Sequence, residues 1–349
     1  MSHFDPFLHS LYYAKQNEML YLLIKDLEVS ELHYLITGGA GFIGTNLTLR
    51  LLKEGHQVTV LDNFSTTSAD RLKNTKATVI NGSVLDKDLL FSLSKNCDYI
   101  IHLAAVVGVR LAMEKGREGL KISYLGTENV LEAAQQYDLG IFISSSSAIY
   151  GKITTKSVAE DDDSLLGSSK KSSWLYSVAK LAEEHLALSY YRELGVKVKI
   201  GRFFNVIGPY QVGDYGMVVP TFVNNALHDK PLVVYGTGLQ TRTFCYIDDI
   251  LNGIELVLNE GKIGEIYNIG GTQEITVLDL AQKIIALTDS KSSIVMIPYE
   301  EAFDRDFEET KQRVPNIAKL ISLGYSPSYS LDEALKKVID YHKCIEEKN

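Results

Sequence analysis

Hydrophobic and polar positions follow two alternating patterns along residues 32–204. Short runs rich in β-branched and aromatic residues are separated by longer stretches whose apolar residues recur at helical spacing. The runs, each a predicted strand, are Tyr34–Ile36, Val58–Leu61, Thr78–Ile80, Tyr99–Ile101 and Ile141–Ile143. Strands that alternate with helix-length segments are typical of parallel sheets with crossover helices. The pattern therefore predicts an α/β fold built on a doubly wound parallel sheet.

The pattern changes after residue 205, where glycine and proline divide the chain into short segments. Helix-compatible stretches follow at 276–288 and 331–347. We interpret this part as a smaller α/β lobe that is interleaved with the first domain. The predicted ranges are 31–204 with a returning segment near 240–270 for the larger domain, and 205–239 with 271–349 for the smaller lobe.

Residues 1–30 carry apolar positions at helical spacing, beginning with Phe4 and Leu8. The apolar run at 19–24 is far shorter than the roughly 20 residues that a membrane span requires, and charged residues interrupt it at once. We therefore predict a helical N-terminal extension without membrane insertion. It packs on the same chain or on a partner subunit, or it serves as a separate docking segment.

The 349-residue chain has 35 basic and 44 acidic residues and a net charge of -9. This balance argues against a protein that coats nucleic acid or an anionic membrane, so any anionic ligand must meet locally placed arginine or lysine. The three cysteines, Cys97, Cys245 and Cys344, are far apart and form no C-x-x-C motif. They predict neither a disulfide framework nor a zinc site, and we expect a cytoplasmic protein without a bound metal.

A glycine-rich turn follows the first predicted strand, with the sequence TGGAGFIG at 37–44. Glycines let the backbone approach a pyrophosphate, whose charge is favoured by the amides and the dipole at the N-terminus of the next helix. The next strand ends in Asp62, where a carboxylate can accept hydrogen bonds from the adenosine ribose and would repel a 2′-phosphate. The fingerprint therefore predicts a Rossmann-type domain that binds NAD rather than NADP.

Polar residues gather at the ends of two later strands and on the helix that follows. One strand ends in HLAA at 102–105 and the next in SSSSAIYG at 144–151. Tyr176 and Lys180 follow at a spacing that places both on one face of a helix. A nearby ammonium and a positive nicotinamide ring stabilise a phenolate, which makes Tyr176 a usable base near neutral pH. We interpret His102 as a support for the cofactor rather than as a catalyst.

With these motifs the chain resembles the extended short-chain dehydrogenases/reductases of the nucleotide-sugar epimerase/dehydratase group, from residue 32 to about residue 340. The matching motifs are TGGAGFIG at 37–44, LDNFS at 61–65, HLAA at 102–105, SSSSAIYG at 144–151, YSVAK at 176–180, RFFNVIGPYQ at 202–211, VVYGTGLQTRTFCYIDDI at 233–250 and YNIGG at 267–271. The resemblance implies an NAD-binding Rossmann domain and a smaller lobe that binds a nucleotide sugar. It also implies a homodimer that pairs two helices from each subunit, at 118–137 and 174–194.

The resemblance assigns roles to individual residues. It implies that Ser146 hydrogen-bonds the reacting sugar oxygen, that Tyr176 is the base and that Lys180 is its partner. The implied cofactor-binding residues are Gly38, Gly41, Phe42, Ile43, Gly44, Asp62, Asn63, Leu103, Ala104, Ala105, Tyr176 and Lys180. The implied substrate-binding residues are Ser146, Ser147, Asn205, Arg242 and Arg313, with Asn205 and the arginines at the diphosphate, and Val234 and Tyr235, whose backbone meets the nucleobase.

Two positions depart from the pattern of this group. Ser83 replaces an Asp that is usual near the adenine. Ser123 stands where an Asn often precedes the Gly-Thr at 126–127 and supports the active site. Both changes leave the predicted fold as it is.

The expected reaction follows from two side chains that the chain lacks. Enzymes of this group begin by oxidising the hydroxyl on carbon 4 of a nucleotide sugar. The 4,6-dehydratases carry Asp and Glu just after the catalytic hydroxyl residue, and the glucuronate decarboxylases keep the Glu, where this chain has Ser147 and Ala148. Because a 4-epimerase needs neither carboxylate, we expect NAD-dependent epimerisation of a UDP-sugar at carbon 4.

The alternatives are a UDP-glucuronate decarboxylase, a nucleotide-sugar 4,6-dehydratase and a non-catalytic dinucleotide sensor. For the decarboxylase, Glu160 in the acidic loop is the candidate that would replace the missing carboxylate.

Overall fold

A computed structural model describes residues 31–107, 109–153, 155, 157–213, 217–302, 308, 310 and 312–347. The predicted helical extension at residues 1–30 lies outside the described residues.

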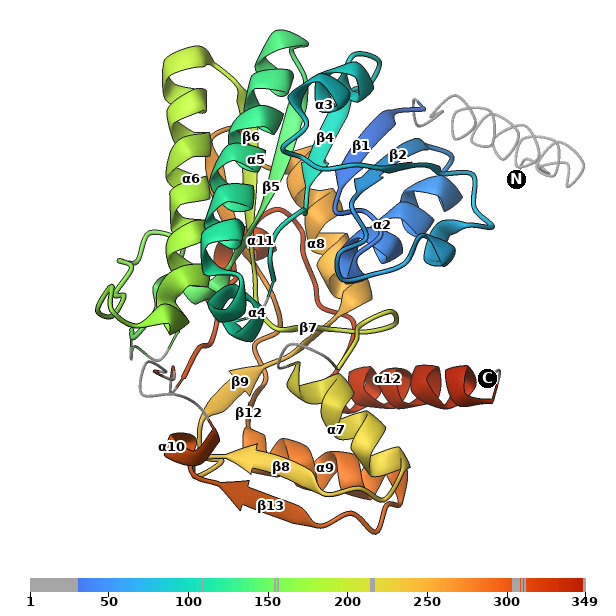
Figure 1. Cartoon of the computed structure of the whole chain (residues 1–349), viewed down its shortest axis with the longest axis vertical. Coiled ribbons are helices and arrows are strands. Elements are labelled where there is room, and N and C mark those ends of the chain that lie inside the picture. The colour runs from blue at the N-terminus through green and yellow to red at the C-terminus, as the bar shows by residue number, and fades with distance from the viewer. Residues whose placement is uncertain are drawn as a thin grey trace, which may run out of the picture. The chain divides into compact units, whose positions relative to one another are not determined.

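Within this part of the chain, seven parallel strands form the central sheet, in the order β11-β6-β5-β4-β1-β2-β3 (Figure 1). Their bounds are β1 His33–Thr37, β2 Gln57–Asp62, β3 Thr78–Asn81, β4 Tyr99–His102, β5 Gly140–Ser146, β6 Lys197–Phe203 and β11 Glu265–Ile269. The predicted doubly wound parallel sheet is confirmed. The strand order reverses between β1 and β4, and sheets of this kind bind ligands at such a point, beyond the carboxyl ends of the strands.

Helices cover both faces of the sheet (Figure 1). On one face, α5 (Gly116–Gln136) packs between α3 (Lys87–Ser94) and α6 (Leu175–Leu194). On the other face, α2 (Phe42–Lys53) contacts α8 (Ile247–Glu260). The short helix α4 (Val109–Glu114) contacts α5 and α6.

The core of the sheet consists of the apolar runs that predicted its strands. Ile36, Ile101 and Ile143 have no exposed surface. Strands of a parallel sheet are covered on both faces, so nearly every position in them favours an apolar residue. The chain leaves α6 through Gly195, whose φ of 71° is a left-handed conformation that favours glycine and ends the helix.

The smaller lobe is built from helices and short strands after residue 205. Its strands are β7 Val206–Ile207, β8 Leu232–Tyr235, β9 Thr241–Thr243, β10 Cys245–Tyr246, β12 Glu274–Thr276 and β13 Ile294–Ile297. They form three pairs among the described residues, β7 with β10, β8 with β13 and β9 with β12. The helices here are α7 Val218–Leu227, α9 Val277–Thr288, α10 Tyr299–Ala302, α11 Ala318–Ile321 and α12 Leu331–Glu346.

The chain returns from this lobe to the large sheet through α8 and β11, and α11 also packs against these two elements. The domain boundaries predicted from the sequence stay a prediction. Short 3-10 turns lie at Ala69–Leu72 (η1), Ser147–Tyr150 (η2) and Ser172–Trp174 (η3). No helix in the described ranges is both long enough and apolar enough to cross a membrane.

Candidate active site

A large cleft lies at the carboxyl ends of the strands, between the sheet and the smaller lobe. Its volume is about 1690 Å³, and its lining comes from the turn after β1, the ends of β4 and β5, the start of α6 and segments beyond residue 205. Pockets for single small ligands usually measure roughly 300–1,000 Å³. The cleft therefore has room for a dinucleotide and a second ligand.

The glycine-rich turn forms one end of the cleft. Gly38 has a φ of 70°, and a Cβ atom there would lie 2.7 Å from the backbone nitrogen of Ala104. A Cβ on Gly44 would lie 2.4 Å from the carbonyl oxygen of Gly38, so only glycine allows the turn to close this tightly. Gly41 precedes α2 and offers no side-chain cap, which leaves the amides at the start of the helix for an anion. The backbone here fits a pyrophosphate.

Asp62 ends β2 beside this turn. Its Oδ2 accepts a hydrogen bond from the Ala40 amide at 3.0 Å, and its Oδ1 accepts one from the Phe64 amide at 2.9 Å. Burial raises the pKa of Asp62 above its ordinary value, while the two amides act to lower it. The amides fix the carboxylate at the edge of the cleft, where each oxygen keeps a further lone pair for a ribose hydroxyl.

The remaining cofactor-binding residues predicted from the sequence lie on the same lining. They are Phe42, Ile43, Asn63, Leu103, Ala104 and Ala105. Ser83, one of the two departures from the family pattern, also lines the cleft. The donor set and the close approach of the backbone therefore fit NAD.

The cleft lining also includes Ser146, Tyr176 and Lys180. Ser146 is the last residue of β5, and its hydroxyl accepts a hydrogen bond from the Ala148 amide at 3.2 Å. Tyr176 and Lys180 lie one turn apart on α6. Lys180 is buried, and its Nζ donates hydrogen bonds to the Ser144 carbonyl at 2.8 Å and to Glu183 Oε2 at 2.9 Å. The structure thus brings the three predicted catalytic residues to one site.

The charge on Lys180 depends on its neighbours. Burial acts to lower the pKa of Lys180, but Glu183, Tyr176 and Glu184 outweigh this effect and raise the pKa above its ordinary value. The lysine therefore stays protonated beside Tyr176.

His102 lies at the end of β4 and is fully enclosed. Its Nδ1 is 2.7 Å from the Thr37 hydroxyl, and its Nε2 is 3.2 Å from the Thr127 hydroxyl. Burial lowers the pKa of His102 to about 3, with a smaller effect in the same direction from Lys180. A neutral ring held between two hydroxyls agrees with a supporting role rather than a catalytic one.

Most of the residues predicted to bind substrate line the same cleft. Its lining includes Ser147, Asn205, Tyr235, Arg242 and Arg313. Asn205 donates to the Thr243 carbonyl at 2.8 Å, and Arg313 donates to the Thr310 hydroxyl at 2.9 Å. Val234 differs, because its side chain is fully buried in β8 and does not line the cleft. Only its backbone is left for a ligand.

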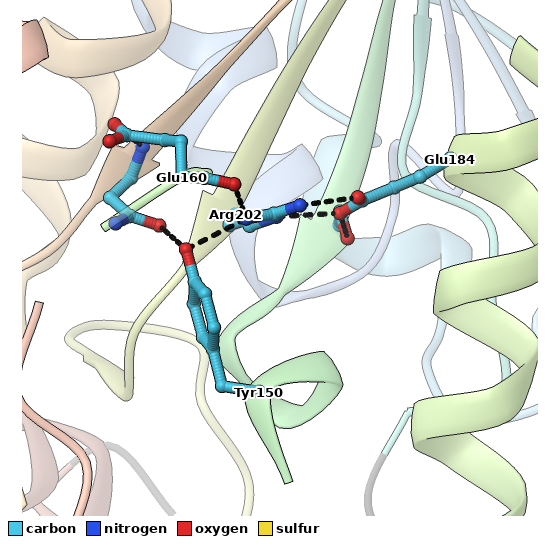
Figure 2. Close-up of polar contacts among 6 residues, drawn as sticks. Tyr150, Glu160, Glu184 and Arg202 are labelled. Carbon is cyan, nitrogen blue, oxygen red and sulfur yellow. Dashed lines mark hydrogen bonds and ion pairs between the residues drawn. The ribbon is translucent and has the colours of Figure 1, made fainter. Parts of the chain in front are cut away.

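A buried network behind the catalytic residues joins β5, β6 and α6 (Figure 2). Arg202 on β6 forms an ion pair with Glu184 on α6 at 2.8 Å and donates to the Tyr150 hydroxyl at 2.8 Å. Tyr150 in turn donates to Asn268 Oδ1 at 2.7 Å. On β5, the Ser145 hydroxyl also donates to Glu184. The network thus ties the strand that ends in Ser146 to the helix that carries Tyr176 and Lys180.

Glu160 belongs to this network. Its carboxylate accepts a hydrogen bond from the backbone amide of Asn268 at 2.8 Å, and its backbone carbonyl accepts one from the Arg202 guanidinium at 2.7 Å (Figure 2). It is not among the residues that line the cleft. The structure therefore does not support the expectation that Glu160 replaces the missing catalytic carboxylate, because one carboxylate oxygen is bound to β11 and the backbone carbonyl to β6.

The sequence analysis missed two carboxylates of the site. Glu183 follows Lys180 by three residues, a spacing at which helical side chains meet, so the pair was readable from the sequence. Glu308 lines the cleft and accepts hydrogen bonds from Lys171 and the Trp174 ring nitrogen at 2.8 and 2.9 Å. Hydrogen bonds from Lys152, Lys171 and Trp174 lower its pKa to about 2. No local signal links partners more than a hundred residues apart.

Comparison with known proteins identifies the family. The model of the NAD dependent epimerase/dehydratase family matches residues 34–270 of this chain. The chain belongs to this family. The predictions of family membership and of NAD as the cofactor are thereby confirmed.

The relatives of this chain within the family are named for different reactions. The chain is 39% identical over 316 residues to the UDP-N-acetyl-alpha-D-glucosaminuronate decarboxylase of Bacillus cytotoxicus, covering 89% of this chain and 98% of the relative. It is 34% identical over 310 residues to UDP-glucuronic acid decarboxylase 1 of Danio rerio, covering 88% and 72%.

Among solved structures, a UDP-glucuronic acid 4-epimerase variant from Bacillus cereus, in complex with a fluorinated UDP-glucuronic acid analogue and NAD, has a TM-score of 0.81. It is 30% identical, with 90% of this chain and 100% of that chain covered. The decarboxylase relatives favour the alternative reaction over the 4-epimerisation that the sequence analysis placed first. The comparisons thus show that the protein is an enzyme of the nucleotide-sugar epimerase, dehydratase and decarboxylase group.

Proposed function

We propose that the protein decarboxylates a UDP-hexuronate after oxidation at carbon 4, with UDP-N-acetylglucosaminuronate and UDP-glucuronate as the first candidates for the substrate. The observation that carries the proposal is the 39% identity to a UDP-N-acetyl-alpha-D-glucosaminuronate decarboxylase over nearly its whole length. The proposal is also supported by the presence of all three predicted catalytic residues on one cleft, namely Ser146, Tyr176 and Lys180.

The missing carboxylates beside Ser146 are compatible with decarboxylation. Oxidation of carbon 4 makes the sugar a β-keto acid, whose carboxylate leaves as carbon dioxide without a base. The bond between carbons 5 and 6 breaks, its electrons form an enolate on the carbon-4 oxygen, and carbon 5 then takes one proton. The protein has to stabilise the oxyanion, and the Ser146 and Tyr176 hydroxyls are the donors available for that task.

Dehydration makes a different demand. It needs a base for the proton on carbon 5 and an acid for the hydroxyl that leaves from carbon 6. Ser147 and Ala148 supply neither, so the site disfavours the 4,6-dehydratase alternative.

The proposed roles follow from the lining of the cleft. Tyr176 accepts the proton of the carbon-4 hydroxyl, and the Lys180 ammonium stabilises the phenolate that makes this possible. Bound NAD supplies reversible hydride exchange at carbon 4. Arg242, Arg313 and Asn205 hold the diphosphate, because a protein with a net charge of -9 needs local cations for an anionic substrate.

A second candidate is 4-epimerisation of the same UDP-hexuronate. The absence of carboxylates at positions 147 and 148 favours it, since an epimerase needs no group that acts on carbon 5. In this reaction the hydride returns to the other face of carbon 4 before carbon dioxide is lost.

The experiment offers a panel of UDP-sugars to the purified protein in D₂O and analyses the products by mass and NMR. We expect a UDP-pentose from a UDP-hexuronate, with carbon dioxide released and one deuterium on carbon 5. A product of unchanged mass, inverted at carbon 4 and free of deuterium, would establish the second candidate instead. Failure to convert any UDP-sugar would contradict both.

We also propose that the enzyme is a homodimer. Six large apolar side chains of α5 and α6 are at least a third exposed; they are Leu120, Tyr124, Leu125, Val178, Tyr191 and Leu194. Exposed apolar side chains on two adjacent helices are typical of an interface between subunits.

A further inference from the structure

Glu183 places a second buried charge behind the proposed catalytic residues. Its Oε2 lies 2.9 Å from Lys180 Nζ, and the two side chains are 1% and 3% exposed. The residue lies about one turn beyond Lys180 on the same face of α6, so that Lys180 stands between it and Tyr176 along the helix. The other carboxylate oxygen, Oε1, has no hydrogen-bond partner among the described residues. Lys180 is therefore the principal partner of Glu183.

The charged groups around this pair leave Glu183 as the counter-ion of Lys180. On α6, the charge of Glu184 also helps to raise the pKa of Lys180. Both carboxylate oxygens of Glu184, however, accept hydrogen bonds from Arg202 of β6, and one of them also accepts a hydrogen bond from the Ser145 hydroxyl. On β4, His102 is neutral near pH 7, because burial lowers its pKa to about 3.

The facing helix α5 contributes Ser123. Its hydroxyl favours the charged form of Glu183 and so opposes the burial that raises the pKa of this carboxyl. Ser123 is the position where the sequence departs from the Asn that often supports the active site. In this chain, the buried Ser123 and Glu183 lie together behind Lys180.

A buried ammonium needs such a partner. Full burial without a counter-ion lowers the pKa of a lysine by roughly 3–5 units. The Ser144 carbonyl, the other acceptor of Lys180, carries no net charge. Without Glu183, Lys180 would become a neutral amine and Tyr176 would keep its proton, because two neutral groups are favoured over a buried phenolate and ammonium that lack solvation.

We propose that Glu183 is a positioning residue that keeps Lys180 protonated and so keeps Tyr176 available as a base. The proposal rests on the proposed function only in its assignment of Tyr176 and Lys180, and it holds for decarboxylation and epimerisation alike.

The test compares Glu183→Gln with the wild type as NAD-bound protein. The first readout is the ultraviolet absorbance of tyrosinate during a pH titration, with Tyr176→Phe identifying the component that belongs to Tyr176. We expect the midpoint of this component to move to higher pH by about one unit or more in Glu183→Gln. The second readout is the pH–rate profile on a converted UDP-sugar, whose acidic limb should move by the same amount.

The expected kinetic pattern separates this role from a structural one. In Glu183→Gln, kcat near neutral pH should fall about tenfold or more and recover at higher pH, with KM nearly unchanged. Glu183→Asp keeps the charge at a longer distance and should move the midpoint less. Glu193→Gln makes the same change at an exposed position of the same helix and should behave as the wild type.

Three results would overturn the proposal. They are a Tyr176 component whose midpoint is unchanged or lower in Glu183→Gln, a loss of kcat that is equal at every pH, and a wild-type titration from which Tyr176→Phe removes no component. If Glu183→Gln does not fold, as judged by thermal melting and NAD content, an unmoved midpoint in Glu183→Asp decides against it. The titration needs no turnover, so failure to convert UDP-sugars would contradict the proposed function alone.

Discussion

Removal of the charge on Glu184 should destabilise the protein strongly, because it breaks the ion pair of the buried network. Glu184 and Arg202 are 3% and 6% exposed, and Arg202 donates two hydrogen bonds to this carboxylate, at 2.9 and 2.8 Å. Glu184→Gln keeps the shape of the side chain but leaves the guanidinium without a counter-charge. Breaking one side of a buried ion pair costs about 3–5 kcal/mol. Because whole domains are stable by only about 5–15 kcal/mol, the loss is large.

Tyr150→Phe gives the internal comparison. It removes one donor to Asn268 and one acceptor of Arg202 but leaves the ion pair intact, so we expect a cost of about 1–3 kcal/mol. The assay is urea unfolding at a fixed NAD concentration, since a ligand that binds the native state adds to its stability. The slope of free energy against urea should stay constant, because the unfolded surface is the same.

The order of the two variants tests the reasoning. If Tyr150→Phe is more destabilising than Glu184→Gln, or if Glu184→Gln costs less than about 1 kcal/mol, the ion pair does not hold the network together. Glu193→Gln, an exposed change on the same helix, should stay within about 0.5 kcal/mol of the wild type.

Other predictions concern catalysis, the cofactor and assembly. Tyr176→Phe should bind NAD and UDP-sugar nearly as the wild type does but turn over roughly 10²–10⁴ times more slowly, because it loses the acid–base group; near-normal turnover would refute the assignment. Asp62→Ala should retain less NAD after gel filtration and discriminate less against NADP, and an unchanged preference would mean that other groups hold the ribose. The double variant Leu120→Lys with Tyr124→Lys should be a monomer in light scattering, because it places charges in the proposed interface. A wild-type protein that is already monomeric at micromolar concentration would contradict that interface.

The parts of the fold that local patterns determine could be predicted from the sequence. The strands of the large sheet are buried on both faces, so their apolar runs stand out from the helices between them. The glycine turn was equally readable, because Gly38 and Gly44 occupy positions where a Cβ atom would collide with the backbone. Tyr176 and Lys180 were predicted from helical spacing together with the glycine fingerprint and the Ser-rich strand end that precede them.

What the sequence could not predict depends on contacts between distant segments. Glu160 stands in an acidic stretch typical of a solvated loop, yet Asn268 and Arg202 hold it in the interior network. Glu308 meets Trp174 and Lys171 only after the chain has folded back across the cleft.

The choice between decarboxylation and epimerisation also depends on contacts between distant segments. Both use Ser146, Tyr176 and Lys180 in the same way up to the 4-keto sugar, so these residues cannot separate them. Carbon dioxide leaves only when the bond to the carboxylate stands roughly perpendicular to the plane of the carbonyl, because its electrons must enter the carbonyl π system. That angle depends on how the sugar is held, and the cleft lining includes Trp174, two residues before Tyr176, and Glu308, which lies far from the motifs in sequence. Glu308 forms ion pairs with both Lys152 and Lys171, so this cluster carries a net positive charge that attracts a sugar carboxylate. We therefore expect this part of the cleft to help set the angle and hence the product.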